Sequence, residues 1–123
     1  MPDPASRITI WHNPKCSTSR AVLGLLRARG VEPEIVEYLK TPPGVADIRQ
    51  VLAEAGLKAR DLVRRKEPLF RELGLDAPGV DEAALVAAMA EHPILIERPV
   101  VRASSGTRLC RPVERLDEIV PAG

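Results

Sequence analysis

The sequence predicts an α/β fold built from a β-α-β half, a helical insertion and a β-β-α half. Three observations support this order: a β-branched run followed by an amphipathic stretch near the N-terminus, helical periodicity through residues 44–92, and two strand-like runs near the C-terminus. A chain of 123 residues is long enough to bury one core. We therefore expect a single domain over residues 1–123, with the helical insertion at about 44–92.

The N-terminal half is predicted as strand, helix and strand. Residues 7–11 alternate in polarity and are β-branched, which favours a strand. Residues 17–29 carry apolar side chains at helical spacing, and Gly30 ends that helix. Residues 34–39 read as a second strand, broken by the run at 41–44. A short right-handed crossover of this kind places the two strands parallel.

The central segment is predicted to be helical. Residues 45–55 place their apolar side chains on one face, with Gly56 as the stop. Two short helices are expected at 59–65 and 68–73. A longer helix over residues 81–91 begins at an aspartate that suits the N-cap.

The C-terminal half is predicted as two strands and a helix. Residues 98–103 and 107–110 are the strands, joined by a hairpin turn at 104–106. Pro112 suits position N1 of a last helix that buries Val113, Leu116 and Ile119 or Val120. The whole order is thioredoxin-like, and in such proteins a cysteine between the first strand and the first helix is the reactive position.

Composition narrows the class of partner. The chain has only one Trp, one Tyr and one Phe, which argues against a platform for stacking bases. Its 18 basic and 17 acidic residues are interspersed and give a net charge of +1, so no basic block favours nucleic acid or a membrane surface. We expect a small-molecule partner and, since neither a signal peptide nor an apolar span is evident, a cytoplasmic location.

The two cysteines have different sequence surroundings. In a reducing compartment we expect no disulfide between Cys16 and Cys110, and their spacing to other Cys and His residues predicts no metal site, although His12 lies four residues before Cys16. Cys16 stands where a strand ends and a helix begins. Unpaired N–H groups and the helix dipole favour a thiolate there. Cys110 lies in a short apolar strand and is expected to be structural.

The segment around Cys16 resembles that of a known family. The run His12-Asn13-Pro14-Lys15-Cys16, followed by small polar residues and Ser19-Arg20, is similar to the active-site segment of the glutaredoxin-dependent arsenate reductases. Further segments resemble that family in its order and spacing: residues 38–43, 62–65, 72–75, 92–99 and 106–112. The resemblance covers about residues 7–120. It implies a thioredoxin-like fold and an oxidoreductase that acts in arsenic detoxification.

The resemblance also implies a role for individual residues. The family's catalytic cysteine maps onto Cys16, and its three oxyanion-binding arginines map onto Arg64, Arg98 and Arg111. Arg65 is an alternative to Arg64, because one step along a helix turns the side chain by about 100°. Supporting roles fall to His12 as a base or cation near the thiol, to Ser17 and Thr18, and to Pro99, which resembles the family's cis-proline.

The mechanism that the resemblance implies needs an external thiol. The Cys16 thiolate attacks arsenate, expels water and forms a thiol–arsenate adduct, which glutathione reduces as co-substrate. Glutaredoxin then resolves the glutathionyl disulfide, with release of arsenite. No bound cofactor is expected. The sequence agrees, since Ser19 stands where a Cys-x-x-Cys motif has its second cysteine.

Two alternatives remain open at the level of sequence. The related Spx-like regulators bind RNA polymerase and use a Cys-x-x-Cys redox switch, which Ser19 removes. The second alternative is a similar thiol oxidoreductase of unassigned substrate, because Ser17 stands where many of the reductases have glycine. A side chain at that position changes the helix start that meets the anion, or only caps the helix.

Overall fold

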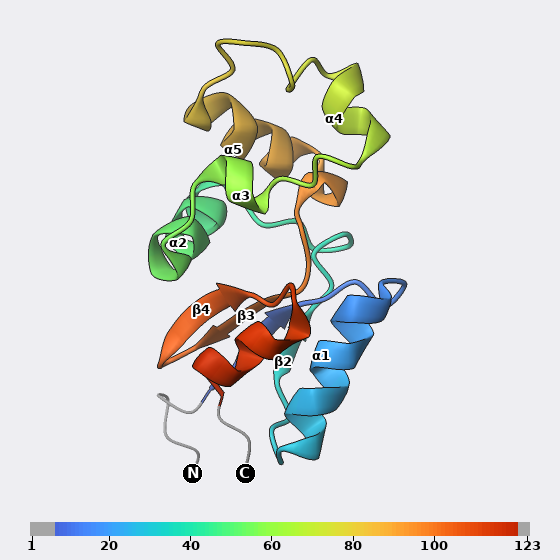
Figure 1. Ribbon diagram of the computed structural model, residues 1–123, viewed down its shortest axis with the longest axis vertical. Helices are drawn as coiled ribbons and strands as arrows, with labels where there is room; N and C mark the ends of the chain where they lie inside the picture. Colours follow the sequence, from blue (N-terminus) through green and yellow to red (C-terminus); the bar gives the residue numbers. More distant parts are fainter. Residues whose placement is uncertain (1–6, 121–123) are drawn as a thin grey trace. The chain divides into compact units, whose positions relative to one another are not determined.

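The computed structural model describes residues 7–120, which form one sheet and a set of helices (Figure 1). The elements in chain order are β1 (Thr9–Trp11), α1 (Ser17–Ala28), β2 (Glu34–Val36), α2 (Val45–Ala55), α3 (Ala59–Leu62), α4 (Pro68–Glu72), α5 (Glu82–Glu91), the 3-10 helix η2 (Pro93–Leu95), β3 (Val100–Ala103), β4 (Gly106–Leu109) and the 3-10 helix η3 (Val113–Glu118). The predicted α/β class and the predicted order of elements are confirmed.

The chain folds as two compact units. Among the described residues, the sheet unit contains residues 7–41 and 98–120, and the helical unit is Pro42–Glu97. The helical unit includes the insertion predicted at about 44–92 and extends a few residues beyond it at both ends. That the two units make a single domain stays a prediction.

The sheet has the strand order β2-β1-β3-β4. Strands β1 and β2 are parallel and joined by α1, whereas β3 is antiparallel to both β1 and β4. Ile10, for example, pairs with Ile35 on one side and with Val101 on the other. The carboxyl ends of β1, β2 and β4 therefore lie at the same edge of the sheet as the amino end of β3.

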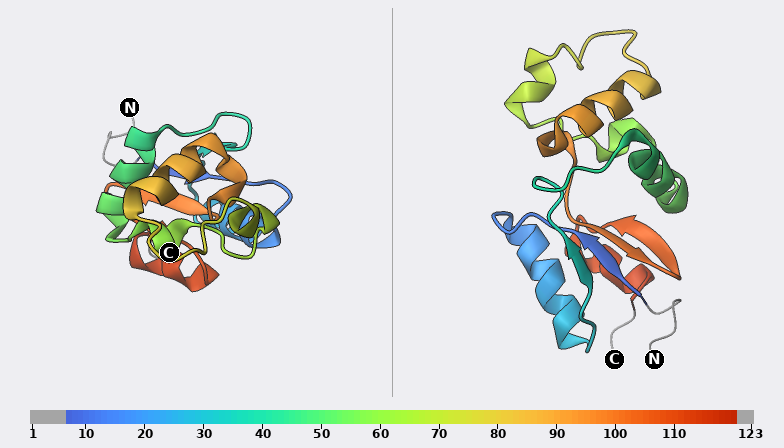
Figure 2. Two further views of the ribbon diagram at one scale, coloured as in Figure 1. Left: turned by 90° about the horizontal axis from the view of Figure 1, so that it is seen from above. Right: turned by 180° about the vertical axis from the view of Figure 1, so that it is seen from behind.

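The core of the sheet unit lies between the sheet and two helices. Helices α1 and η3 pack against each other and against one face of the strands (Figures 1 and 2). The buried side chains there are Ile10, Val22, Leu23, Leu26, Val101, Cys110, Leu116, Ile119 and Val120. Each large aliphatic side chain buried in this way contributes about 1.5–3 kcal/mol. This packing anchors α1, and with it the first turn that follows Cys16.

Helix α1 ends at the glycine that the sequence predicts. Gly30 adopts a φ of +79°, a left-handed conformation that a side chain disfavours. Its N–H donates to Arg27 O at 3.0 Å, and the next N–H, of Val31, donates to Leu26 O at 2.9 Å. The last carbonyls of the helix are therefore satisfied by the turn itself.

The helical unit packs α2 and α3 against α5. As predicted, α5 starts at an N-cap aspartate, since Asp81 Oδ1 accepts the Ala84 N–H at 2.9 Å. The side chains buried in this unit include Ile48, Val51, Leu52, Leu62, Leu85, Val86, Met89 and Leu95. Val63 pairs with Ile96 in an isolated antiparallel bridge, which joins the end of α3 to the segment after η2.

Several predicted boundaries in the first two thirds of the chain are wrong. The helix predicted at 59–65 ends at Leu62, because the backbone on either side of Val63 bonds to Leu95 and Glu97 instead of continuing the helix. The strand predicted at 34–39 ends at Val36, and a turn follows. The short helix η2 was not predicted.

The C-terminal half also differs in detail from the prediction. The strand predicted to start at residue 98 starts at Val100, after the cis peptide bond between Arg98 and Pro99. The last helix is a 3-10 helix with Pro112 at its N-cap instead of N1. It buries Leu116 fully and leaves Val113 half-buried.

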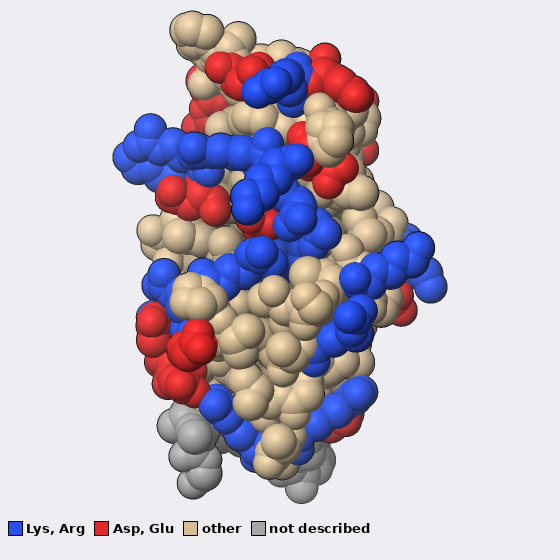
Figure 3. Space-filling view, turned by 45° about the vertical axis from the view of Figure 1, so that its right-hand side comes forward, with Lys and Arg blue, Asp and Glu red and all other residues tan. Residues whose placement is uncertain are grey.

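Charged side chains of both signs are spread over the surface. In the view of Figure 3, the Lys and Arg side chains of the sheet unit stand in separate groups around an uncharged surface. Within residues 7–120, no helix combines the length and the apolar character that a membrane crossing requires.

Candidate active site at the start of helix α1

Segments that are far apart in the sequence meet at one edge of the sheet. The loop that carries Cys16 follows the carboxyl end of β1, and Tyr38 comes shortly after the carboxyl end of β2. At the same edge Arg98 and Pro99 lead into β3, and Arg111 follows β4. Two backbone bonds fix the edge: the His12 N–H donates to Val36 O at 2.9 Å, and the Cys110 N–H donates to Pro99 O at 2.9 Å.

Cys16 is the N-cap residue of α1. It is extended, with φ −96° and ψ 123°, and its carbonyl accepts the Arg20 N–H at 3.0 Å as the helix begins. Its side chain forms no close capping hydrogen bond, and the residue is partly exposed. The thiol is therefore accessible at the positive end of a twelve-residue helix.

The surroundings of Cys16 favour the thiolate. Burial alone raises the pKa of the thiol, but the Ser19 N–H and the hydrogen bond and charge of the Arg98 guanidinium outweigh that effect. The Thr18 N–H acts in the same direction. The net pKa of Cys16 is lowered, as expected for a thiol at a helix start beside an arginine.

A second arginine of the same unit approaches the sulfur. Arg111 Nη1 lies 4.0 Å from Cys16 Sγ and donates to the Arg98 carbonyl oxygen at 3.2 Å. Arg98 and Arg111 thus place two guanidinium groups beside one thiol, as the resemblance implies. Pro99 follows a cis peptide bond, and the prediction of a cis-proline is confirmed.

His12 and Ser19 form a buried network behind the thiol. His12 Nδ1 lies 2.6 Å from Ser19 Oγ, and the same hydroxyl oxygen accepts the Asn13 N–H at 3.1 Å. Burial lowers the pKa of His12, with the charge of Glu37 opposing it, which favours the neutral imidazole. The tautomer of that imidazole decides whether Nδ1 or the Ser19 hydroxyl donates in their hydrogen bond. Ser19 is fully buried, and this network fixes the loop on the first turn of α1.

Two buried polar residues at this edge were missed by the sequence interpretation. Asn13 Oδ1 accepts the Lys15 N–H at 3.0 Å and so shapes the loop before Cys16. Tyr38 is completely buried, although it carries a hydroxyl. The available signals were an asparagine before Pro14, typical of a turn, and the chain's only tyrosine at the end of a strand.

Arg64 and Arg65 belong to the helical unit and point to different partners. Arg64 is half-buried, with Nη1 2.8 Å from a Glu97 carboxylate oxygen. Arg65 is exposed, and its Nη2 donates to the carbonyl oxygen of Arg60, a residue of α3, at 3.0 Å. Of the three predicted arginines, Arg98 and Arg111 lie with Cys16 in the sheet unit, and a role of Arg64 there stays a prediction.

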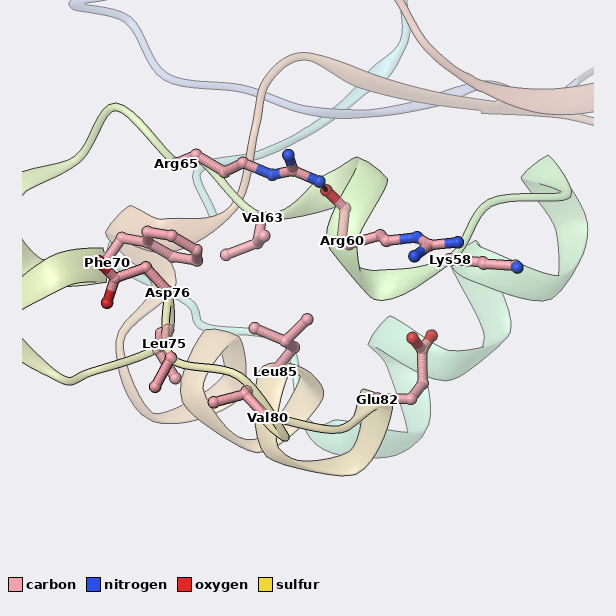
Figure 4. Close-up of a pocket in the computed structure, with 11 residues that line it drawn as sticks. Lys58, Arg60, Val63, Arg65, Phe70, Leu75, Asp76, Val80, Glu82 and Leu85 are labelled. Atoms are coloured by element: carbon pink, nitrogen blue, oxygen red, sulfur yellow. Dashed lines mark hydrogen bonds between the residues drawn. The ribbon is translucent and has the colours of Figure 1, made fainter.

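A separate pocket of about 570 Å³ lies in the helical unit (Figure 4). Its apolar side chains surround a space rimmed by charged ones; the lining residues are Lys58, Arg60, Val63, Arg65, Phe70, Leu75, Asp76, Ala77, Val80, Glu82 and Leu85. No cysteine, serine or histidine is among the residues that line it. Among residues 7–120, no three His, Cys, Asp or Glu side chains gather as a metal site would require.

The fold and this edge define a thioredoxin-like protein with an accessible, arginine-flanked thiol. Residues 11–119 match the ArsC family, and the chain belongs to that family. An arsenate reductase of Rhizobium meliloti is 51% identical over 114 residues, which span 93% of this chain and 81% of that protein. The Escherichia coli protein YfgD, described as uncharacterized, is 47% identical over 115 residues, 93% of this chain and 97% of that one. The solved arsenate reductase of Vibrio cholerae superposes with a TM-score of 0.89 at 43% identity, covering 93% of this chain and 98% of that chain.

Proposed function

We propose that this protein is an arsenate reductase whose nucleophile is Cys16. The observation that carries the proposal is the placement of the Arg98 and Arg111 guanidinium groups beside a thiol at the start of α1. Family membership and the names of the close relatives support the same activity.

The arrangement suits an anionic substrate. Arsenate near neutral pH is a tetrahedral oxyanion with one to two negative charges, so a thiolate that approaches it is repelled. Arginine presents planar, permanently charged donors that match the oxygens of such an anion, and a helix start adds N–H groups and a positive dipole. In our proposal Arg98 and Arg111 hold the oxygens, and Arg64 is the third ligand that the family pattern assigns.

The proposed reaction has three steps. The Cys16 thiolate attacks arsenic, an S–As bond forms, and one oxygen leaves as water after protonation. A glutathione thiolate then attacks Cys16 Sγ, so that the electron pair of the S–As bond passes to arsenic, which leaves as arsenite in the +3 state. Glutaredoxin reduces the resulting disulfide between glutathione and Cys16 and restores the thiol.

Neither Ser19 nor Cys110 supplies a second thiol for the reaction, which supports the dependence on an external thiol. Ser19 occupies the position of a second cysteine in a Cys-x-x-Cys motif and bonds to His12. Cys110 is fully buried, and burial raises its pKa to about 12, so it supplies no thiolate near neutral pH. Glutathione and glutaredoxin are abundant reductants of the cytoplasm, and we propose that the protein works there.

A coupled assay tests the proposal. The purified protein is incubated with arsenate, glutathione, glutaredoxin, glutathione reductase and NADPH, and Cys16→Ser is the control. We expect arsenate-dependent oxidation of NADPH by the parent and none by Cys16→Ser. If the parent shows no turnover while a known arsenate reductase is active in the same mixture, the proposal is wrong.

A second candidate, a thiol oxidoreductase for a different tetrahedral oxyanion, rests on Ser17. This residue is exposed in the first turn of α1, next to the thiol. A panel of arsenate, phosphate, selenate and sulfate with the parent and Ser17→Gly separates the candidates. Turnover with arsenate alone, retained in Ser17→Gly, supports arsenate; turnover only with another anion supports the second candidate.

A further inference from the structure

Tyr38 is a buried polar side chain at the Cys16 edge that has no part in the proposed reaction. It follows β2 and has no exposed surface, and it is the only tyrosine in the chain. A phenylalanine would fill the same apolar space. A buried phenol oxygen is costly unless it is hydrogen-bonded, so its partners indicate why a hydroxyl stands there.

The Tyr38 hydroxyl faces two polar side chains of the site. Burial raises the pKa of Tyr38, while the charge of Arg98 and hydrogen bonds from Asn13 and Arg98 act in the opposite direction. Hydrogen bonds that favour the ionised form are those in which the phenol oxygen accepts. The oxygen therefore accepts from the Asn13 amide and from the Arg98 guanidinium.

Both partners lead directly to Cys16. Arg98 donates to the Cys16 sulfur and lowers the pKa of the thiol. Asn13 belongs to the loop itself: its backbone oxygen accepts the Cys16 N–H at 3.0 Å, and its Oδ1 accepts the Lys15 N–H at 3.0 Å. One phenol oxygen thus joins the loop that carries the nucleophile to the arginine that precedes β3.

We propose that Tyr38 is a positioning residue whose hydroxyl holds the Arg98 guanidinium against Cys16 Sγ and ties it to the loop through Asn13. An arginine side chain has several rotatable bonds, and each orientation away from the sulfur weakens both its charge effect and its hydrogen bond. A fixed acceptor for the guanidinium favours the orientation that serves the thiolate. Its benefit to arsenate binding rests on the proposed function, whereas its effect on the thiol does not.

The main test compares Tyr38→Phe with a matched loss of a hydroxyl elsewhere in the sheet unit. Ser105 lies in the turn between β3 and β4, at the edge of the sheet opposite the Cys16 loop. Its Oγ donates to Ile119 O at 2.6 Å, so Ser105→Ala is the control. The rate of Cys16 alkylation by iodoacetamide is measured against pH, with the labelled residue identified by mass spectrometry. This measurement needs no arsenate, so it stands even if the reductase assay fails.

In Tyr38→Phe we expect the alkylation midpoint to move up by about 0.5 to 1 pH unit, so that the rate well below the midpoint falls about three- to tenfold. Ser105→Ala keeps the parent profile. In an Arg98→Ala background, Tyr38→Phe has no further effect, because the arginine through which it acts is gone. If Tyr38→Phe keeps the parent midpoint while losing as much thermal stability as Ser105→Ala, its role is structural and the proposal is overturned.

A second measurement leaves the phenol in place in case Tyr38→Phe does not fold. Growth on 3-fluorotyrosine labels Tyr38 alone, since the chain has one tyrosine. We expect the ¹⁹F resonance to follow the titration of Cys16, and to lose that response in Arg98→Ala. A resonance that ignores the Cys16 titration in the parent would overturn the proposal.

Discussion

The two cysteines of this chain lie in surroundings that shift the pKa of the thiol in opposite directions. Cys16 caps a helix and is partly exposed. Burial raises the pKa of its thiol, but Ser19, Arg98 and Thr18 together lower it further than burial raises it. Cys110 directly follows β4 and lies inside the aliphatic core, and burial raises its pKa to about 12. The same side chain is thus a nucleophile at one position and an inert core group at the other.

The comparison shows that local surroundings, not residue type, set the chemistry of a thiol. The two places are nevertheless linked along the chain. Arg111 comes directly after Cys110, and it reaches Cys16 Sγ. By packing at the end of β4, Cys110 helps to fix the point from which Arg111 extends. Its contribution is therefore mechanical, whereas that of Cys16 is chemical.

Exchanging each thiol in turn gives the largest expected difference. Cys16→Ser should lower arsenate-dependent turnover by about 10³-fold or more, because the attacking atom is lost. Cys110→Ala should keep turnover within about twofold of the parent at a temperature where both are folded. The coupled NADPH assay measures both, and circular dichroism confirms the fold. Equal losses in the two variants would remove the distinction.

The two arginines beside Cys16 give the next largest effect. We expect Arg98→Ala and Arg111→Ala each to lower kcat/KM for arsenate by about 10²-fold, the usual cost of one lost donor to a developing anion. Arg108→Ala is the matched control, since Arg108 lies on β4, three residues before Arg111, and its Nε pairs with a Glu118 carboxylate oxygen of η3 at 2.8 Å. Steady-state kinetics decide the outcome. If all three variants lose activity in proportion to their thermal stability, Arg98 and Arg111 are structural.

Features of the fold that depend on local contacts could be predicted from the sequence, and those that depend on long-range contacts could not. The Cys16 helix start, Gly30 and the Asp81 cap follow from local rules about helix ends, so the sequence indicated them directly. The end of α3 at Leu62 did not, because a long-range bridge from Val63 to Ile96 overrides the helical pattern. Local periodicity carries no information about such a partner.

The site shows the same division. Arg98 and Arg111 were assigned from a family resemblance, and no spacing rule in this chain brings them to Cys16. The Tyr38 contacts were missed, because hydrogen bonds to Asn13 and Arg98 join three segments that meet only when the sheet forms. Ser19 was interpreted as the absence of a cysteine, whereas its hydroxyl has a structural role of its own.

Removing the Ser19 hydroxyl tests the network behind Cys16. Ser19→Ala leaves the buried Asn13 N–H and His12 Nδ1 without their partner, and we expect the free energy of unfolding to fall by about 1–3 kcal/mol. Ser17→Ala, in the same turn but exposed, should change it by no more than about 0.5 kcal/mol. Urea unfolding measures both. Equal, small changes would show that the network does not stabilise the loop.

Alkaline pH gives the smallest effect and tests the other cysteine. The pKa of Cys110 is raised in the folded state, so its contribution to stability is full below the pKa of the unfolded thiol and is lost as pH rises toward about 12. Between pH 8 and pH 10 we expect the parent to lose about 1–2 kcal/mol more than Cys110→Ala. Urea midpoints at the two pH values provide the measurement, and parallel losses would place the Cys110 thiol in a less protected environment.

The central claim is that Cys16 is a thiolate near neutral pH and that the Cys110 thiol is inert. One titration tests both statements. The native parent is treated with iodoacetamide from pH 5 to pH 10, and the label at each cysteine is quantified by mass spectrometry. We expect Cys16 to react with a midpoint below that of a free thiol, about 8.5, and Cys110 to stay unlabelled until the protein unfolds. A Cys16 midpoint at or above the free-thiol value, or labelling of Cys110 at the same rate, would contradict the account.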